Sequence, residues 1–440
     1  MLYRNFFIAA MLAITVPALA FAASLDNPPA AADIGATKND QQRLRSLEER
    51  VKQLESAPPA PSPASSVNSF NPAISLILSG LYTNLSQDPA NYRITGFPVP
   101  SSVEIGPGRR GFSLAESELG IYANIDPYFY GGLNYSMHPD NTASVEEAFI
   151  QTIALSGGVT VKAGRFFSGI GYLNAQHAHI WDFTDAPLAY QAFLGTQFGD
   201  DGVQIKWLVP TDTFLEFGAE FGRGRSFPGS DRDKNGSGAG TVFAHVGGDI
   251  GANHSWRAGL SVLDTAPRNR KLSETSLAGT AVTDSFNGDS RLWIADFVWK
   301  YAPNGNPVRT NFKLQAEYLR RHEDGNLTYD TAGVSRTAPY DARQSGWYLQ
   351  GVYQFMPYWR VGLRTEQLDH GTVDYSSNNA NLPRSNFNPS KDSVMVDYSP
   401  SEFSRIRVQF AQDKSRQSVT DNQAFVQYQM SLGAHGAHQY

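Results

Sequence analysis

From residue 71 to the end of the chain, runs of about ten residues alternate apolar with polar side chains. One of these runs alternates Ile406, Val408 and Phe410 with Arg405, Arg407 and Gln409. Side chains of a β-strand point to opposite faces with period 2, so each run has one apolar and one polar face. Such repeated runs are typical of an all-β chain that closes into an antiparallel transmembrane β-barrel.

The links between the runs are by turns short and long. The short links, rich in Gly, Pro, Asn, Asp and Ser, lie at 126–127, 155–157, 210–212, 251–253, 302–307, 356–357 and 399–401. The long links lie at 87–111, 138–144, 165–200, 222–240, 264–289, 321–344, 369–391 and 413–421. Seven short and eight long links separate sixteen strands. In outer-membrane barrels short turns face the periplasm, so both termini are expected there.

Composition and aromatic placement agree with a barrel. Tryptophans flank the short links (Trp207, Trp256, Trp299, Trp359) and the long links (Trp293, Trp347), as two interfacial girdles would require. The chain lacks cysteine, which excludes disulfides and thiolate chemistry. A net charge of −6, spread along the chain, gives no indication of nucleic-acid binding.

The N-terminal part predicts export. Arg4 precedes an apolar stretch and small residues, which predicts a signal peptide over 1–23. Residues 24–56 contain Leu44, Leu47, Val51 and Leu54 at heptad spacing, either a short coiled-coil helix that supports a trimer or a solvated amphipathic helix. A Pro/Ala-rich linker follows over 57–69, and the barrel is expected over 70–440, with Tyr440 as a terminal signal for the barrel-assembly machinery.

The polar faces of the strands carry fixed charges, which set ion selectivity in pores or pair across strands to brace the wall. The basic residues expected to line the pore are Lys162, Arg165, Lys206, Arg257, Lys313, Arg360, Arg364, Arg405 and Arg407. The acidic residues expected to line it are Glu116, Glu118, Glu147, Glu317 and Glu366, with Glu216 and Glu220 also pointing inward.

Two sets of residues are candidate metal ligands. The third long link contains His177, His179 and Asp182, and imidazole with carboxylate suits zinc or copper. Asp231, Asp233 and Asn235 copy the first half of a calcium loop, but Val242 stands where the bidentate carboxylate belongs. A structural loop and an ordinary hydrophilic loop are the respective alternatives. His435 and His438 form a further pair that belongs to the last expected strand.

The sixteen expected strands, the heptads and Gly164-Arg165-Phe166-Phe167 before a long third link resemble the phosphate-selective porin O and P family. A more specific resemblance covers most of the barrel. It rests on the stretches NPAIS at 71–75, VEEAFI at 145–150, NAQHAH at 174–179, AFLG at 192–195 and LGAHGAH at 432–438. These stretches are similar to those of proteobacterial proteins labelled zinc-regulated TonB-dependent outer-membrane receptors. The usual receptor of that kind has an N-terminal plug domain, which is absent between the expected signal and the first strand.

These observations together predict a porin in the outer membrane of a Gram-negative bacterium, a water-filled channel for passive diffusion of small hydrophilic or ionic solutes. The third long link, over 165–200, is expected to fold into the lumen and form the constriction, as the resemblance to porins implies. Expected partners are outer-membrane lipid and lipopolysaccharide, two further copies in a homotrimer, and the barrel-assembly machinery. No enzymatic activity and no cofactor are expected. The alternative is a metal-linked uptake receptor or gated channel that binds zinc at His177 and His179.

Overall fold

The computed structural model describes residues 72–433. The expected signal peptide, heptad segment and linker, His435, His438 and Tyr440 lie outside the described residues. No helix among the described residues is long and apolar enough to cross a membrane.

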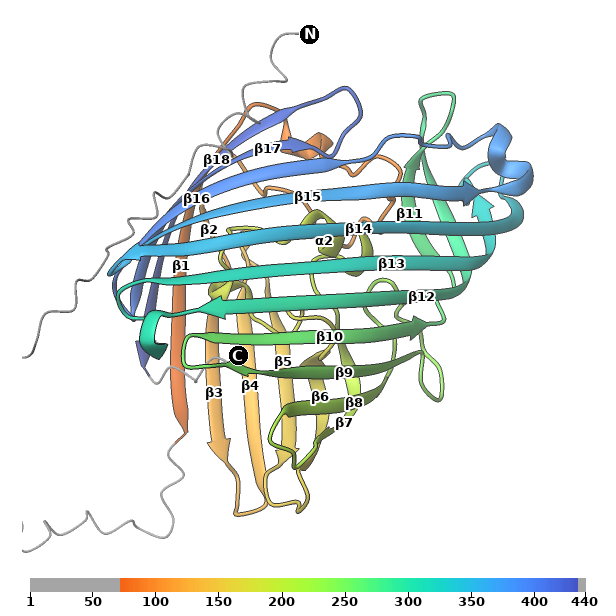
Figure 1. Ribbon diagram of the computed structural model, residues 1–440. Helices are drawn as coiled ribbons and strands as arrows, with labels where there is room; N and C mark the ends of the chain where they lie inside the picture. Colours follow the sequence, from red (N-terminus) through yellow and green to blue (C-terminus); the bar gives the residue numbers. More distant parts are fainter. Residues whose placement is uncertain (1–71, 434–440) are drawn as a thin grey trace, which may run out of the picture. The chain divides into compact units, whose positions relative to one another are not determined.

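The described chain is built almost entirely of β-strands (Figure 1). The strands are β1 (Ala73–Leu85), β2 (Gly111–Leu114), β3 (Ser117–Asn124), β4 (Phe129–Met137), β5 (Ala143–Thr152), β6 (Val159–Phe167), β7 (Gly199–Leu208), β8 (Phe214–Gly222), β9 (Ala239–Ile250), β10 (His254–Thr265), β11 (Arg270–Thr275), β12 (Ala281–Tyr301), β13 (Asn311–Tyr329), β14 (Arg336–Met356), β15 (Trp359–Asp374), β16 (Ser390–Ser401), β17 (Ser404–Lys414) and β18 (Asp421–Gly433). The helical segments are η2 (Pro89–Asn91), η3 (Ala178–Ile180), α2 (Leu188–Leu194), η4 (Pro303–Gly305) and η5 (Ser376–Ala380).

Antiparallel pairing joins the strands into one closed sheet. Most strands pair with their neighbours in sequence, and β1 pairs with β18 from Ser75↔Gly433 to Leu85↔Gln423, which closes the barrel. β2 and β3 both pair with β1, and β10 and β11 both pair with β12, so each of these couples is one interrupted strand of the barrel wall. The predicted barrel of sixteen antiparallel strands is therefore confirmed.

The alternation of the sequence becomes an apolar outer face and a polar inner face. On β18, Val426 is 44% exposed on the outer face, whereas the next residue, Gln427, is 8% exposed inside the barrel. Trp207, Trp293 and Trp347 are also exposed. Closure of the barrel satisfies the ladder hydrogen bonds internally, and the apolar exterior can contact hydrocarbon. A bilayer requires both.

Two of the long links are mostly strand. Residues 264–289 and 321–344 were expected to be loops, but β12 pairs with β13 continuously from Tyr301↔Phe312 to Ser285↔Thr328. β13 and β14 then continue to Tyr329↔Arg336, so these three strands are among the longest in Figure 1. The polar side chains of these segments led to the prediction of loops. Polar segments can form strands, because ladder hydrogen bonds join backbone groups and do not require apolar side chains. A small apolar cluster around Phe286 stabilises the extension.

The outer face generates a prediction about stability. Leu260 lies at the middle of β10 and is 67% exposed, so Leu260→Arg should place a charge in the hydrocarbon and lower the free energy of unfolding by about 2–4 kcal/mol. Leu277 is 59% exposed but lies in the link between β11 and β12, so Leu277→Arg should cost below about 1 kcal/mol. Denaturant unfolding in lipid vesicles measures both values. Equal costs would contradict a membrane belt around β10.

Candidate functional site

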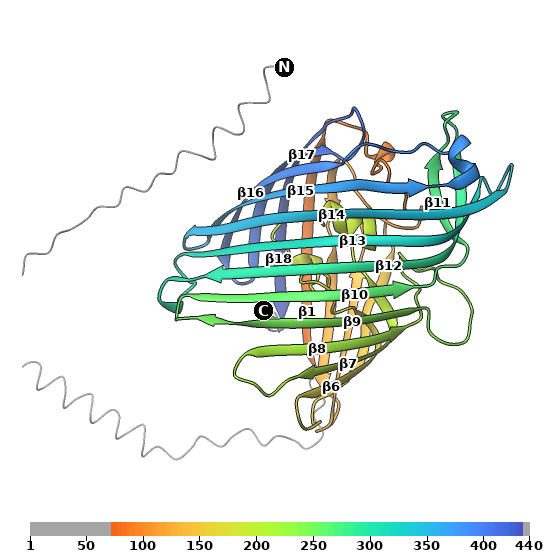
Figure 2. The same cartoon turned by 45° about the vertical axis from the view of Figure 1, so that its right-hand side comes forward.

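The long segment between β6 and β7, residues 168–198, lies inside the barrel. Figures 1 and 2 show α2 within the ring of strands. Every residue of α2 is buried, and the helix belongs to an apolar cluster that includes the wall residues Leu292, Leu319 and Leu368. Pro187 precedes the helix, and Gly195 ends it with φ of 63°, a left-handed conformation that favours glycine. We call residues 168–198 the lumen segment.

Buried wall carboxylates hold the backbone of the lumen segment. Glu317 on β13 accepts hydrogen bonds from the backbone N–H groups of Tyr172 (3.2 Å) and Leu173 (3.0 Å) and from the Tyr190 hydroxyl (2.8 Å). Glu366 on β15 accepts one from the N–H of Leu188 at 2.5 Å. Because a buried N–H group without a partner costs free energy, these carboxylates determine where the segment can dock.

Two aspartates of the lumen segment bind cationic groups of the wall. Asp182 forms ion pairs with Lys313 and with Arg360 (3.2 Å). Asp185 forms ion pairs with Arg364 (2.9 Å) and Lys391 (2.6 Å). Burial raises the pKa of both carboxyl groups, but the attraction of these cations outweighs it and holds each pKa below its usual range.

The anchoring changes the role of several residues expected to line the pore. Glu317, Arg364, Glu366 and Arg407 point inward, but each is buried, so the prediction that they line a water-filled pore is wrong. Arg407 donates to Asp397 at 3.2 Å. The lumen segment covers this part of the wall, which alternation along a strand cannot reveal.

Other inward-facing residues contact the wall or the lumen segment. Lys206 pairs with Glu216 at 3.0 Å. The Lys162 ammonium lies 4.4 Å from the centre of the Phe149 ring. Arg257 donates to the carbonyl oxygen of Gly171 at 3.2 Å. Glu220 accepts a hydrogen bond from the N–H of Gly169 at 2.9 Å.

Arg165 was expected in the lumen, and the structure contradicts this. It shares a strand face with Val161 and Ala163, and it pairs with Asp201 at 2.6 Å on the same face. Lys162 and Arg165 are separated by an odd number of positions, so a regular strand places them on opposite faces.

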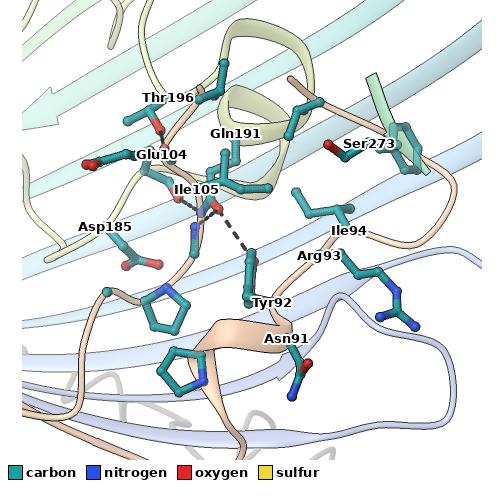
Figure 3. A pocket seen from close by; sticks show the side chains of 18 of the residues that line it. Asn91, Tyr92, Arg93, Ile94, Glu104, Ile105, Asp185, Gln191, Thr196 and Ser273 are labelled. Carbon is teal, nitrogen blue, oxygen red and sulfur yellow. Dashed lines mark hydrogen bonds between the residues drawn. The ribbon is translucent and has the colours of Figure 1, made fainter. Parts of the chain in front are cut away.

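Two cavities lie within the barrel. The larger, of about 1250 Å³, is lined by residues between β1 and β2, by parts of the lumen segment and by Glu116. Figure 3 shows Gln191 of α2 between Tyr92 and Glu104, and the Gln191 side chain accepts a hydrogen bond from the N–H of Gly106 at 2.9 Å. The smaller cavity, of about 810 Å³, lies toward the short turns and has Lys313, Arg360 and Arg405 in its lining.

His179 lines both cavities, so this residue marks where the lumen segment separates them. Its carbonyl oxygen accepts a hydrogen bond from Arg405 at 2.7 Å. Its Nδ1 lies 3.1 Å from Glu118 Oε2. At the border between the cavities, His179 therefore contacts one basic and one acidic group.

His177 and His179 meet a group of wall carboxylates. His177 Nδ1 lies 3.3 Å from Glu118 and 3.1 Å from Glu146, and its Nε2 lies 3.1 Å from Glu147. Glu146 was not among the residues expected to face inward, because it precedes Glu147 and neighbours in a regular strand face opposite ways. A β-bulge between the pairs of Asn134 and Tyr135 turns both glutamates inward.

The structure separates Asp182 from the two histidines in the first set of expected metal ligands. Asp182 was grouped with the histidines, but it belongs to the ion pairs with Lys313 and Arg360, so that grouping is wrong. Asp231, Asp233 and Asn235 are exposed, and Asp231 pairs with Arg223 at 2.8 Å. Calcium binding there stays a prediction.

No family model matches the chain. A protein of Aquifex aeolicus strain VF5, described as uncharacterized, is 29% identical over 403 residues, which cover 85% of this chain and 81% of that protein. An anion-selective porin from Comamonas acidovorans covers 82% of this chain and 99% of its own, with 11% identity and a TM-score of 0.49. The outer-membrane channel DcaP of Acinetobacter baumannii covers 82% and 97%, with 11% identity and a TM-score of 0.48.

The carboxylate of Glu317 generates a prediction about docking. Glu317→Leu should leave the buried donors of Tyr172, Leu173 and Tyr190 without an acceptor and destabilise docking by about 2–4 kcal/mol. Amide hydrogen exchange should then become about 100-fold faster in residues 168–198. Glu216→Gln is the matched control, because Glu216 contacts Lys206 and His245, which lie outside the lumen segment. Unchanged exchange in Glu317→Leu would show that this anchor is dispensable.

The depressed pKa values of Asp182 and Asp185 generate a second prediction. A carboxyl group with a lowered pKa stabilises the docked state above its undocked pKa of about 3.9, and this contribution is lost as the pH falls through the lower docked pKa. The lumen segment should therefore resist pepsin at pH 4 and become cleavable only at lower pH. Lys391→Met removes a partner of Asp185 and should move the onset of cleavage to higher pH, whereas Lys206→Met should not. Identical profiles for the two variants would refute the assignment.

Proposed function

We propose that this protein is a porin of a Gram-negative outer membrane, a channel for passive diffusion of small hydrophilic or ionic solutes. The observation that carries the proposal is a closed barrel with a polar interior that holds a cavity on each side of an inserted segment, both bordered by His179. The apolar exterior suits a bilayer, and the polar interior suits water. The lumen segment would form the constriction.

The charges beside the cavities would favour some ions over others without selecting a single solute. The smaller cavity has the basic residues Lys300, Lys313, Arg360 and Arg405 and the acidic residues Asp182, Asp249 and Glu402 in its lining. Both signs face the passage, and fixed charges bias which ions pass a narrow pore. The buried charges in contact with the lumen segment act as structural anchors, so catalysis is not part of the proposal.

The orientation and assembly follow from the same proposal. The short turns would face the periplasm and the longer links the exterior, which places both ends of the barrel at the periplasmic side. A homotrimer, contacts with lipopolysaccharide and folding by the barrel-assembly machinery stay predictions from the sequence.

The alternative function is metal-linked uptake through a gated channel. The observation that favours it is the approach of His177 to Glu118 and Glu146 beside the border of the two cavities. Bilayer conductance separates the two functions, because a porin gives open, ohmic steps in metal-free buffer. A channel that stays closed until micromolar zinc is added would favour the alternative.

The absence of native cysteine allows a direct test of the passage. Gln427 and Gln429 line the larger and the smaller cavity respectively, whereas Val426 on the same strand is on the outer face. A cationic methanethiosulfonate reagent should lower single-channel conductance in Gln427→Cys and Gln429→Cys. Val426→Cys is the matched control and should keep its conductance. Absence of channel conductance, or an equal loss of conductance at all three positions, would contradict the proposed function.

A further inference from the structure

The histidines of the lumen segment converge on one carboxylate oxygen of the wall. Glu118 Oε2 on β3 lies 3.3 Å from His177 Nδ1 and 3.1 Å from His179 Nδ1. Glu146 Oε2 on β5 lies 3.1 Å from the same nitrogen of His177. Among the described residues, Glu118, Glu146 and His177 form a group whose donor atoms all lie within 4.8 Å of one another. His179 adds a second imidazole beside it.

Three of the separations between these atoms are close to the edges of a metal coordination shell. Zinc binds imidazole nitrogen and carboxylate oxygen at about 2.0–2.2 Å, so neighbouring ligands of a tetrahedral site lie about 3.3–3.6 Å apart. The three separations at Glu118 and His177 are 3.1–3.3 Å, a few tenths of an ångström shorter. Small side-chain shifts would therefore admit an ion between Glu118, Glu146 and His177, and a larger turn of the His179 ring would complete the shell.

The opposite nitrogen of His177 has the partner that a metal ligand needs. Its Nε2 lies 3.1 Å from Glu147 Oε2, which accepts a hydrogen bond from it when Nε2 is protonated, and 2.9 Å from the donor Asn134 Nδ2, which pairs with the other tautomer. A carboxylate that accepts the Nε2 proton leaves the Nδ1 lone pair directed at Glu118 and Glu146. This carboxylate–histidine arrangement orients metal-bound imidazoles in many metalloproteins.

The charge of the cluster also favours a cation. The side chains of Glu118, Glu146 and Glu147 are 5–13% exposed, and burying carboxylates side by side is costly unless positive charge compensates them. The wall cations Arg360 and Lys313 are paired with Asp182 and so lie in the other network. A divalent ion would compensate the cluster with both imidazoles neutral.

We propose that Glu118, Glu146 and His177 bind one divalent transition-metal ion, of which Zn²⁺ fits best, and that His179, which already contacts Glu118, turns toward the ion as the fourth ligand. Two imidazoles and two carboxylates suit zinc, whereas Ca²⁺ and Mg²⁺ prefer oxygen ligands alone. The ion would tie the lumen segment to β3 and β5 beside the border of the two cavities. This site does not depend on the proposed channel function, because metal binding is measured without conduction.

The test is titration of the full-length, detergent-solubilised protein with Co²⁺, a spectroscopic substitute for Zn²⁺. The wild type should bind one Co²⁺ at this site, with intense visible absorption of a four-coordinate ion, and Zn²⁺ should abolish that absorption. Glu118→Gln keeps the shape of the side chain, and His177→Gln removes an imidazole. Each should weaken the binding at least 10-fold.

His245→Gln is the matched control. His245 is a buried histidine that contacts one carboxylate, Glu216 at 3.1 Å, so its replacement should leave the Co²⁺ spectrum unchanged. Since His435 and His438 remain in all variants, the differences between variants report this site alone.

A second measurement keeps the test independent of spectra. Zn²⁺ should slow amide hydrogen exchange around residues 177–180 in the wild type but not in Glu118→Gln, with barrel folding of both checked by resistance to detergent unfolding. Equal Co²⁺ spectra in wild type and Glu118→Gln, or no four-coordinate absorption in the wild type, would overturn the proposal.

Discussion

Closure of the backbone hydrogen-bond ladder between β1 and β18 is the constraint on which the rest of the structure depends. An open sheet would leave a row of unpaired N–H and C=O groups, which a hydrocarbon surrounding cannot satisfy. Once the ladder is closed, alternate side chains must point into a shared interior. That interior then collects the charges of all strands, and their compensation becomes the second requirement of the fold.

The lumen segment meets that requirement from inside. It supplies hydrogen-bond donors to Glu317 and Glu366 and the carboxylate of Asp185 to Arg364 and Lys391, so the segment provides partners for both signs of charge on the wall. Its apolar side chains, such as Phe193 of α2, pack together against the few apolar residues that face inward. The segment therefore behaves like a small core enclosed by the wall. The two cavities are the space that this core leaves.

The fold was largely predictable, whereas the site was predictable only in part. Sixteen strands followed from counting links, and the error lay in 264–289 and 321–344, where polar strands extend past the expected ends. The inward direction of Glu317 and Arg364 followed from alternation, but their burial did not, since it depends on a segment more than a hundred residues away in the chain. For Arg165, in contrast, the sequence was sufficient. Its odd spacing from Lys162 already indicated that the two side chains lie on opposite faces of the strand.

The sequence by itself determined the alternating strands, their number and the side of the wall for most residues, because a period of two is a local property of extended backbone. Only the tertiary structure decided which inward charges meet water and which hold the lumen segment, because that depends on where the segment docks. It also brought Glu146 beside His177, through a bulge that no local pattern signals. Contacts between distant strands and an enclosed segment are set by closure of the whole barrel.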